Sequence, residues 1–156
     1  MRLHVCAVGR LRAGPEAALI DDYLTRFDRT GRALGLGPAQ VTEVEDKKGG
    51  GVAAEAALLR KALPKGAKLV VMDERGKVMT SPAFADQLGN WRDTGTSDLA
   101  IVIGGADGIA PDLRAEADFA LSFGKMVWPH MLVRVMLAEQ LYRAASILAG
   151  APYHRV

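Results

Sequence analysis

The chain has 156 residues, of which 49% are hydrophobic and 24% charged, and its formal net charge is +2. This composition excludes an intrinsically disordered chain and a bulk polycation that would bind nucleic acid over its whole surface. No apolar run approaches the roughly 20 residues of a membrane-spanning helix, and the N-terminus has no secretory h-region. We therefore expect a cytoplasmic protein with a single domain, residues 1–156.

The first half of the chain alternates short β-rich runs with amphipathic segments. The spacing of apolar residues predicts strands at 3–8, 40–45 and 67–74, and helices at 14–27 and 52–63. Asp22 and Arg26 stand four residues apart, the spacing of an ion pair on one helix face. The lone cysteine, Cys6, lies in an apolar run and is predicted to be buried rather than nucleophilic. No cysteine or histidine spacing indicates zinc, and we expect no metal.

The second half repeats this alternation. The pattern predicts a helix at 80–91, a buried strand running into a glycine-rich turn at 98–108, a helix starting near Pro111, a strand at 118–124 and a helix at 129–150. Ser81 is expected to cap the helix of 80–91, with Pro82 at its first position, and Gly150 to end the last helix. Strands alternating with helices predict an α/β fold, a mostly parallel sheet with helices on both faces.

The segment 129–150 is apolar around most of its circumference. Two stripes at helical spacing carry its apolar residues: Met131, Val135, Ala138 and Tyr142 on one, and Val133, Leu137, Leu141, Ala144 and Leu148 on the other. Such a helix is buried on several sides. It is either the central core helix, or a helix that packs on its own sheet and also against a second subunit.

Glycines follow the buried strand that ends near Ile103. Gly104, Gly105 and Gly108 form a GGxxG stretch, which is neither the dinucleotide GxGxxG nor a phosphate-binding loop. Ligands bind beyond the carboxyl ends of parallel strands, and glycine lets a ligand approach the backbone closely. The stretch is either part of a ligand site or only a tight turn before the helix near Pro111.

Two further groups of residues could carry chemistry. His130 falls at the start of the last helix, where free N–H groups gather, and Arg134 lies one turn further on the same face. With this spacing, both side chains could reach one group of a substrate. Alternatively, His130 only caps the helix and Arg134 lies on a solvated edge. The tail residues Tyr153, His154 and Arg155 suit RNA, because arginine pairs with phosphate and tyrosine stacks on bases. The alternative is a tail folded over an apolar edge.

Several stretches occur in the order and spacing of one known family: VIGGADG, LSFGKMVWPH, RVMLAEQLYRA and the closing PYHR. Over essentially its whole length the chain resembles the bacterial 23S ribosomal RNA pseudouridine-N3 methyltransferases, small members of the SPOUT superfamily. The resemblance implies a deep C-terminal trefoil knot and a homodimer. It also implies S-adenosyl-L-methionine as cofactor, and N3 of a pseudouridine in the 23S rRNA of the assembled ribosome as the methyl acceptor.

The resemblance further implies which residues bind the cofactor. They are Met72, Gly104, Gly105, Phe123, Gly124, Lys125, Met126, Val127 and Trp128. Most of these contacts are expected from backbone atoms. The family often carries serine or threonine where this chain has Gly124 and Val127, so hydroxyl contacts are not expected at those two positions.

The catalytic hypothesis combines the helix start with the tail of a partner subunit. His130 or His154 would accept the N3 proton, since imidazole titrates near neutral pH. Tyr153 would stack on the target base, and three arginines would neutralise phosphates or a developing oxyanion. These arginines are Arg134, Arg143 and Arg155.

Other assignments stay open at this point. Arg10, Arg12, Lys47 and Lys48 either face RNA or form ordinary solvated surface. The chain could also be a related enzyme acting on another RNA base, or a ribosome-binding module without catalysis. A nicotinamide-dependent oxidoreductase is disfavoured, because the first strand is not followed by GxGxxG.

Overall fold

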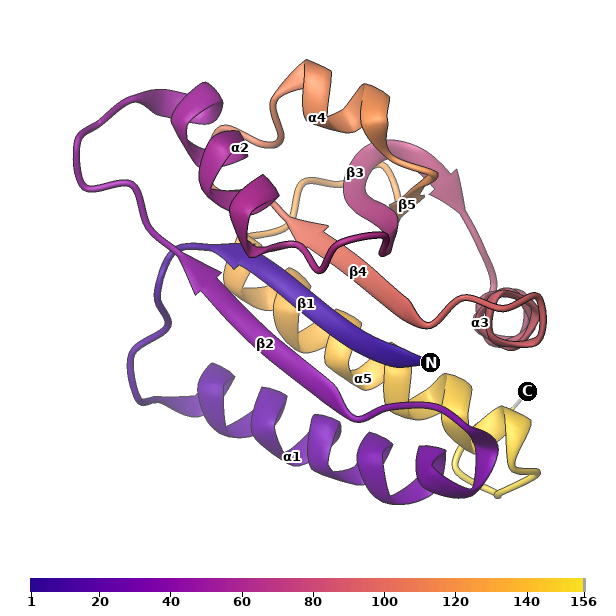
Figure 1. Cartoon of the computed structure of the whole chain (residues 1–156). Coiled ribbons are helices and arrows are strands. Elements are labelled where there is room, and N and C mark those ends of the chain that lie inside the picture. Colours follow the sequence, from indigo (N-terminus) through magenta and orange to yellow (C-terminus); the bar gives the residue numbers. More distant parts are fainter. Residues whose placement is uncertain (156) are drawn as a thin grey trace.

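Five strands, all parallel, form one sheet in the order β2-β1-β4-β3-β5 (Figure 1). The structure is a computed structural model that describes residues 1–155. The strands are β1 (Arg2–Val8), β2 (Ala39–Val44), β3 (Lys68–Val78), β4 (Asp98–Ile103) and β5 (Phe119–Ser122). The helices are α1 (Pro15–Gly31), the short 3₁₀ helix η1 (Arg32–Leu34), α2 (Gly51–Ala62), α3 (Ser81–Asp93), α4 (Pro111–Glu116) and α5 (His130–Leu148).

Helices cover both faces of the sheet, which confirms the predicted α/β architecture. Alternate residues of β1 illustrate the two cores: Leu3 and Val5 pack under α1, α3 and α5, whereas Cys6 and Val8 pack under α2 and α4. Cys6 is fully buried, as predicted, and burial raises its pKa to about 11. The period of two along the strand therefore divides its side chains between the two layers.

The local boundaries follow the predictions with a few differences, one of which is that α1 extends four residues beyond its predicted end, to Gly31. Asp22 and Arg26 form the expected ion pair, 3.2 Å apart. The helix of 80–91 is capped one residue earlier than predicted, because the Thr80 hydroxyl accepts from the Ala83 N–H at 3.2 Å. Ser81 instead donates to Gln140 of α5 at 2.7 Å. Strand β3 continues four residues beyond the predicted end, through an irregularity in its pairing with β5.

Helix α5 lies between α1 and α3 on one face of the sheet (Figure 1). Leu137, Leu141 and Ala144 are almost completely buried against the sheet. Tyr142 of the other stripe packs near Tyr23 of α1, with ring centroids 6.4 Å apart. Packing in the core of its own chain, the central-helix alternative, thus accounts for most of the apolar surface of α5. The trefoil knot implied by the resemblance stays a prediction. Within residues 1–155 no helix combines the length and apolar character that crossing a membrane requires.

The turn after β4 depends on a close approach of two backbone segments. Gly105 and Gly108 form an isolated antiparallel bridge, and the Gly108 N–H donates to the Gly105 carbonyl at 3.0 Å. A Cβ on Gly104 would lie only 2.6 Å from the Gly108 carbonyl oxygen. Position 104 therefore has no room for a side chain.

The same substitution at two glycines should have opposite effects. We expect Gly104→Ala to lower the free energy of unfolding by about 1–3 kcal/mol, the usual cost of overpacking. At Gly89, in the interior of α3, a Cβ would make an ordinary 3.5 Å contact with Leu148. Gly89→Ala should raise stability by about 0.5–1 kcal/mol through helix propensity. Urea denaturation of both variants tests this, and equal effects would contradict the geometry.

Candidate functional site

Residues 72–75 of β3, at the irregularity in its pairing with β5, lie together with the segments after β4 and β5 and the start of α5 around a cavity of about 520 Å³. Its polar and charged lining side chains are Asp73, Glu74, Arg75, Asp107, Arg114 and His130. Its apolar lining includes Met72, Ile103, Leu121 and Phe123. This volume and this mixture of apolar walls with a few polar groups are typical of a small-molecule site.

Two turns shape the cavity, and both need their glycines. In the turn after β4, Gly108 has a φ of 79°, and a Cβ on Gly105 would crowd Val8 at 3.1 Å. In the turn after β5, Gly124 has a φ of 112°. The buried Ser122 hydroxyl holds this second turn by accepting from the Gly124 N–H at 3.0 Å. The backbone is thus exposed to the cavity on two sides.

Most residues predicted to bind the cofactor are brought together here. Met72, Gly104, Gly105, Phe123, Gly124, Met126, Val127 and Trp128 all line the cavity. Lys125 is exposed and does not line it. Ser122 is a hydroxyl that sequence reasoning missed, and it acts on the loop backbone two residues before Gly124.

A charged cluster at the cavity wall was also missed. The carboxylate of Asp73 lies 3.2 Å from Arg75 Nε and 2.7 Å from Arg114 Nε. Burial acts to raise the pKa of Asp73, but hydrogen bonds from Arg75 and the positive charges of Arg75 and Arg114 lower it overall. The stretch MDERGK contained this signal, because an acid and a base flank the end of a buried strand. Asp73 is therefore ionised at neutral pH.

His130 lies where it was predicted, at the first position of α5 and in the cavity wall. Its Nε2 atom lies near the turn after β1, since a Cβ on Gly9 would be 4.0 Å from it. Pro129 precedes it as N-cap without a capping side chain. The imidazole thus stands at the positive end of the helix dipole, between the cavity and the Gly9 turn.

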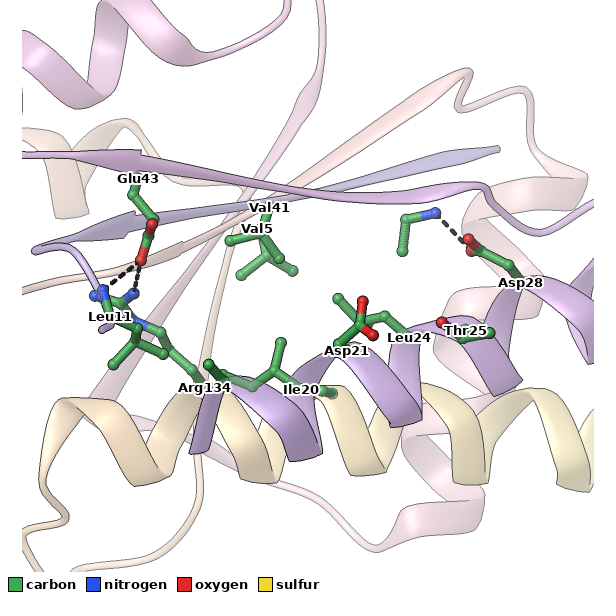
Figure 2. Close-up of a pocket in the computed structure, with 13 residues that line it drawn as sticks. Val5, Leu11, Ile20, Asp21, Leu24, Thr25, Asp28, Val41, Glu43 and Arg134 are labelled. Atoms are coloured by element: carbon green, nitrogen blue, oxygen red, sulfur yellow. Dashed lines mark hydrogen bonds and ion pairs between the residues drawn. The ribbon is translucent and has the colours of Figure 1, made fainter. Parts of the chain in front are cut away.

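Arg134 does not share the cavity with His130, contrary to the expectation from their spacing. It is 3% exposed and lines a second cavity of about 350 Å³ between α1, β1, β2 and α5 (Figure 2). One terminal nitrogen donates to Glu43 at 2.8 Å, and the other donates to the carbonyls of Val8 and Gly9. Desolvation lowers the pKa of Arg134, and Glu43 opposes this effect. Its terminal donors are engaged inside the protein.

The tail folds back onto the C-terminal half of α5. The Tyr153 hydroxyl donates to Glu139 at 3.1 Å, and its ring packs 4.5 Å from the Tyr142 ring. His154 Nδ1 lies 3.1 Å from Arg143. Burial, followed by the charge of Glu139, raises the pKa of Tyr153.

This position separates the tail from the cavity of its own chain. Glu139 and Arg143 stand nine and 13 residues after His130, about 14 and 20 Å along the helix at 1.5 Å per residue. None of Tyr153, His154 or Arg155 lines the cavity. The tail of the same chain therefore does not join His130.

The chain exposes apolar side chains beside the cavity. Met126 and Val127 are 72% and 82% exposed, and they lead into three further exposed apolar residues. These are Trp128, Met131 and Leu132. We call residues 126–132 the apolar rim. Several exposed apolar side chains within one short segment are typical of an interaction site.

The basic residues predicted to face RNA lie in two loops at the same edge of the sheet. Arg10 and Arg12 follow β1, and Lys47 and Lys48 follow β2, so both pairs leave the carboxyl ends of parallel neighbours. All four are exposed, and Arg10 lies 3.3 Å from Glu45. Within residues 1–155 no group of three or more potential metal-ligating side chains gathers.

Comparison with known proteins gives a consistent result over the whole chain. Residues 1–154 match the family described as "Predicted SPOUT methyltransferase". Proteins named "Ribosomal RNA large subunit methyltransferase H" are 77% identical in Ruegeria pomeroyi and 72% identical in Dinoroseobacter shibae, each over 156 residues and the full length of both chains. A probable methylase family protein from Haemophilus influenzae shares the fold, with a TM-score of 0.50 and 11% identity over 99% of this chain and 70% of its own. The chain therefore belongs to the SPOUT family of methyltransferases.

Proposed function

We propose that this protein transfers a methyl group from S-adenosyl-L-methionine to N3 of a pseudouridine in the 23S rRNA of the assembled ribosome. The observation that carries the proposal is the cavity itself, which collects all the predicted cofactor residues except Lys125. The full-length identity to methyltransferases named for the large ribosomal RNA supports the class of substrate. The particular base comes from the sequence resemblance.

The cavity fits the proposed cofactor in size and in chemistry. Its glycine turns offer backbone N–H and carbonyl groups, and Met72, Leu121 and Phe123 offer an apolar slot for an adenine ring. The glycine at position 104, where a Cβ would clash with the Gly108 carbonyl, allows the two backbone segments of this turn to approach each other. When bound, S-adenosyl-L-methionine supplies a methyl group that its sulfonium centre already activates. The protein must then orient the acceptor and take up its proton.

His130 is the proposed proton acceptor within the chain. It lines the cavity, and imidazole is the side chain whose charge changes near neutral pH. Holding the methyl donor and the acceptor in line provides most of the remaining rate enhancement. It does so because a bimolecular encounter is replaced by a reaction between groups that are already oriented. Arg134 is left out of the groups that touch substrate, since its terminal donors are engaged with Val8, Gly9 and Glu43.

A homodimer would complete the site. The tail lies far from the cavity of its own chain, and the apolar rim, residues 126–132, lies beside that cavity. A second copy packed on the rim would bury these side chains and bring its own tail to the cavity. Tyr153, His154 and Arg155 of the partner would then stack on the base, offer a second imidazole and pair with phosphate.

The ribosome would supply much of the recognition. A net charge of +2 is too small for tight non-specific binding, so the shape of a folded RNA and particle must contribute. The exposed basic loops after β1 and β2 stand at the edge of the sheet that carries the cavity and could contact phosphates. Such a substrate places the protein in the cytoplasm.

The cofactor site can be tested with two substitutions in one loop. The wild-type protein should bind S-adenosyl-L-methionine with micromolar affinity in calorimetry and methylate ribosomes that lack this modification. Trp128→Ala should weaken binding by about tenfold or more, because a lining aromatic ring is lost. Lys125→Ala should leave the dissociation constant within about twofold, since Lys125 does not line the cavity. Cofactor binding without any methyl transfer to RNA would instead favour a non-catalytic ribosome-binding module.

The shared site can be tested by mixing two variants that are impaired at different parts of it, at a cofactor concentration too low to saturate the Trp128→Ala chain. A chain truncated after Gly150 should keep cofactor affinity but lose methyl transfer, because it lacks the tail. Refolding it together with the Trp128→Ala chain should restore part of the activity, because mixed dimers pair an intact cavity with an intact tail. The measurement is methyl incorporation into ribosomes. Near wild-type transfer by the truncated chain alone, or no recovery in the mixture, would contradict a tail that acts in the partner.

A further inference from the structure

We propose that Arg134 is a positioning residue, which sets the orientation of His130 by clamping the turn after β1 behind the imidazole. This inference rests on the proposed function, because it deepens the role of the same site. It replaces a direct contact between Arg134 and substrate by an indirect one. The clamp consists of Arg134, Glu43 and the turn from Val8 to Leu11.

The clamp fixes several backbone groups of this turn with two side chains. Arg134 Nη2 donates to the Val8 carbonyl at 2.6 Å and to the Gly9 carbonyl at 2.8 Å. Glu43 Oε2 accepts from Arg134 Nη1 and from the Leu11 N–H, both at 2.8 Å. Figure 2 shows Glu43 reaching down from β2 to both partners at one end of the second cavity. The end of β1, strand β2 and helix α5 are thus joined at one point.

The pinned turn also lies close to His130. A Cβ placed on Gly9 would be 3.5 Å from Arg134 Nη2 and 4.0 Å from His130 Nε2. The two side chains leave α5 one turn apart, and both come within 4.0 Å of the position that a Cβ on Gly9 would take. With a φ of 96°, Gly9 adopts a conformation that other residues rarely take. A shift of this turn would therefore change the space available to the imidazole.

The energetics indicate that this clamp fixes the geometry of the turn rather than adding to the stability of the fold. A buried ion pair loses much of its attraction to desolvation, and apolar replacements are often as stable. Arg134 Nε is buried without a hydrogen-bond partner in the described part of the chain, which adds a further cost. A residue kept for packing alone would not need a guanidinium here. Its planar fork, however, can hold two carbonyls and a carboxylate in fixed directions.

The test compares Arg134→Met, Glu43→Gln and the double variant with the wild-type protein. Arg134→Met should lower kcat for methyl transfer by about 10- to 100-fold, the effect of a small misplacement of a reacting group. The KM for ribosomes and the dissociation constant of S-adenosyl-L-methionine should stay within about twofold. Glu43→Gln keeps the acceptor for Leu11 and should reduce kcat by no more than about threefold. The double variant leaves no unpaired carboxylate, so it should fold stably and still show the low kcat.

A second readout does not depend on activity. The chain has three histidines, and His4 is held by Asp98 on another edge of the sheet at 2.8 Å. Arg134→Met should shift or broaden the imidazole NMR signals of His130 and leave those of His4 unchanged. As a matched control, Arg60→Met removes an exposed ion-pair network with Asp112 and Glu116. This control should alter neither kcat nor the His130 signals.

Each outcome decides the proposal. Wild-type kcat in the folded double variant, or unchanged His130 signals in Arg134→Met, would overturn it. A raised KM for ribosomes with unchanged kcat would show that Arg134 contacts RNA directly, and a weakened cofactor affinity would assign it to the cofactor cavity. If the wild-type protein transfers no methyl group, the proposed function fails, while the NMR comparison still tests whether Arg134 positions His130.

Discussion

The parallel direction of all five strands is the constraint on which the rest of this structure depends. It brings the turns after β1, β4 and β5 to one edge of the sheet, beside the irregular part of β3, and backbone groups there are free of the ladder. Because parallel strands need cover on both faces, their apolar residues divide between two helical layers. The cavity then forms at this edge, between Met72, Gly104 and Phe123.

Helix α5 connects this edge to the remainder of the protein. Its first residue, His130, borders the cavity, and its middle is buried against the sheet. Its last turns hold Tyr153 and His154 through Glu139 and Arg143. One rigid element thus carries two sets of candidate catalytic groups about 14–20 Å apart. A single helix holds the two sets apart, so the proposed homodimer would be needed to bring them into one site.

The charged groups of the site divide into those that face the cavity and those that hold its walls. Asp73 is ionised between Arg75 and Arg114, while the Arg134–Glu43 pair lies behind the wall. Both arrangements contain buried charges whose partners come from different elements. Such pairs contribute modestly to stability but restrict how strands, loops and helices can sit relative to one another. Methyl transfer needs its reacting groups held in fixed positions, and this depends on strands, loops and helices that are restricted in this way.

The order of strands and helices, the glycine turns and the position of His130 could be predicted from the sequence by itself. Apolar periodicity and glycine placement are local properties, and they predicted the α/β class and the glycine-rich turns. The residues expected to bind the cofactor came instead from the resemblance to a known family. The roles of Arg134 and of the tail could not be predicted in this way. Spacing put Arg134 beside His130, but only the tertiary structure turned it toward Val8, Gly9 and Glu43. A hydrogen-bonding partner 91 or more residues away leaves no periodic trace in the sequence, because chain folding alone brings the two together.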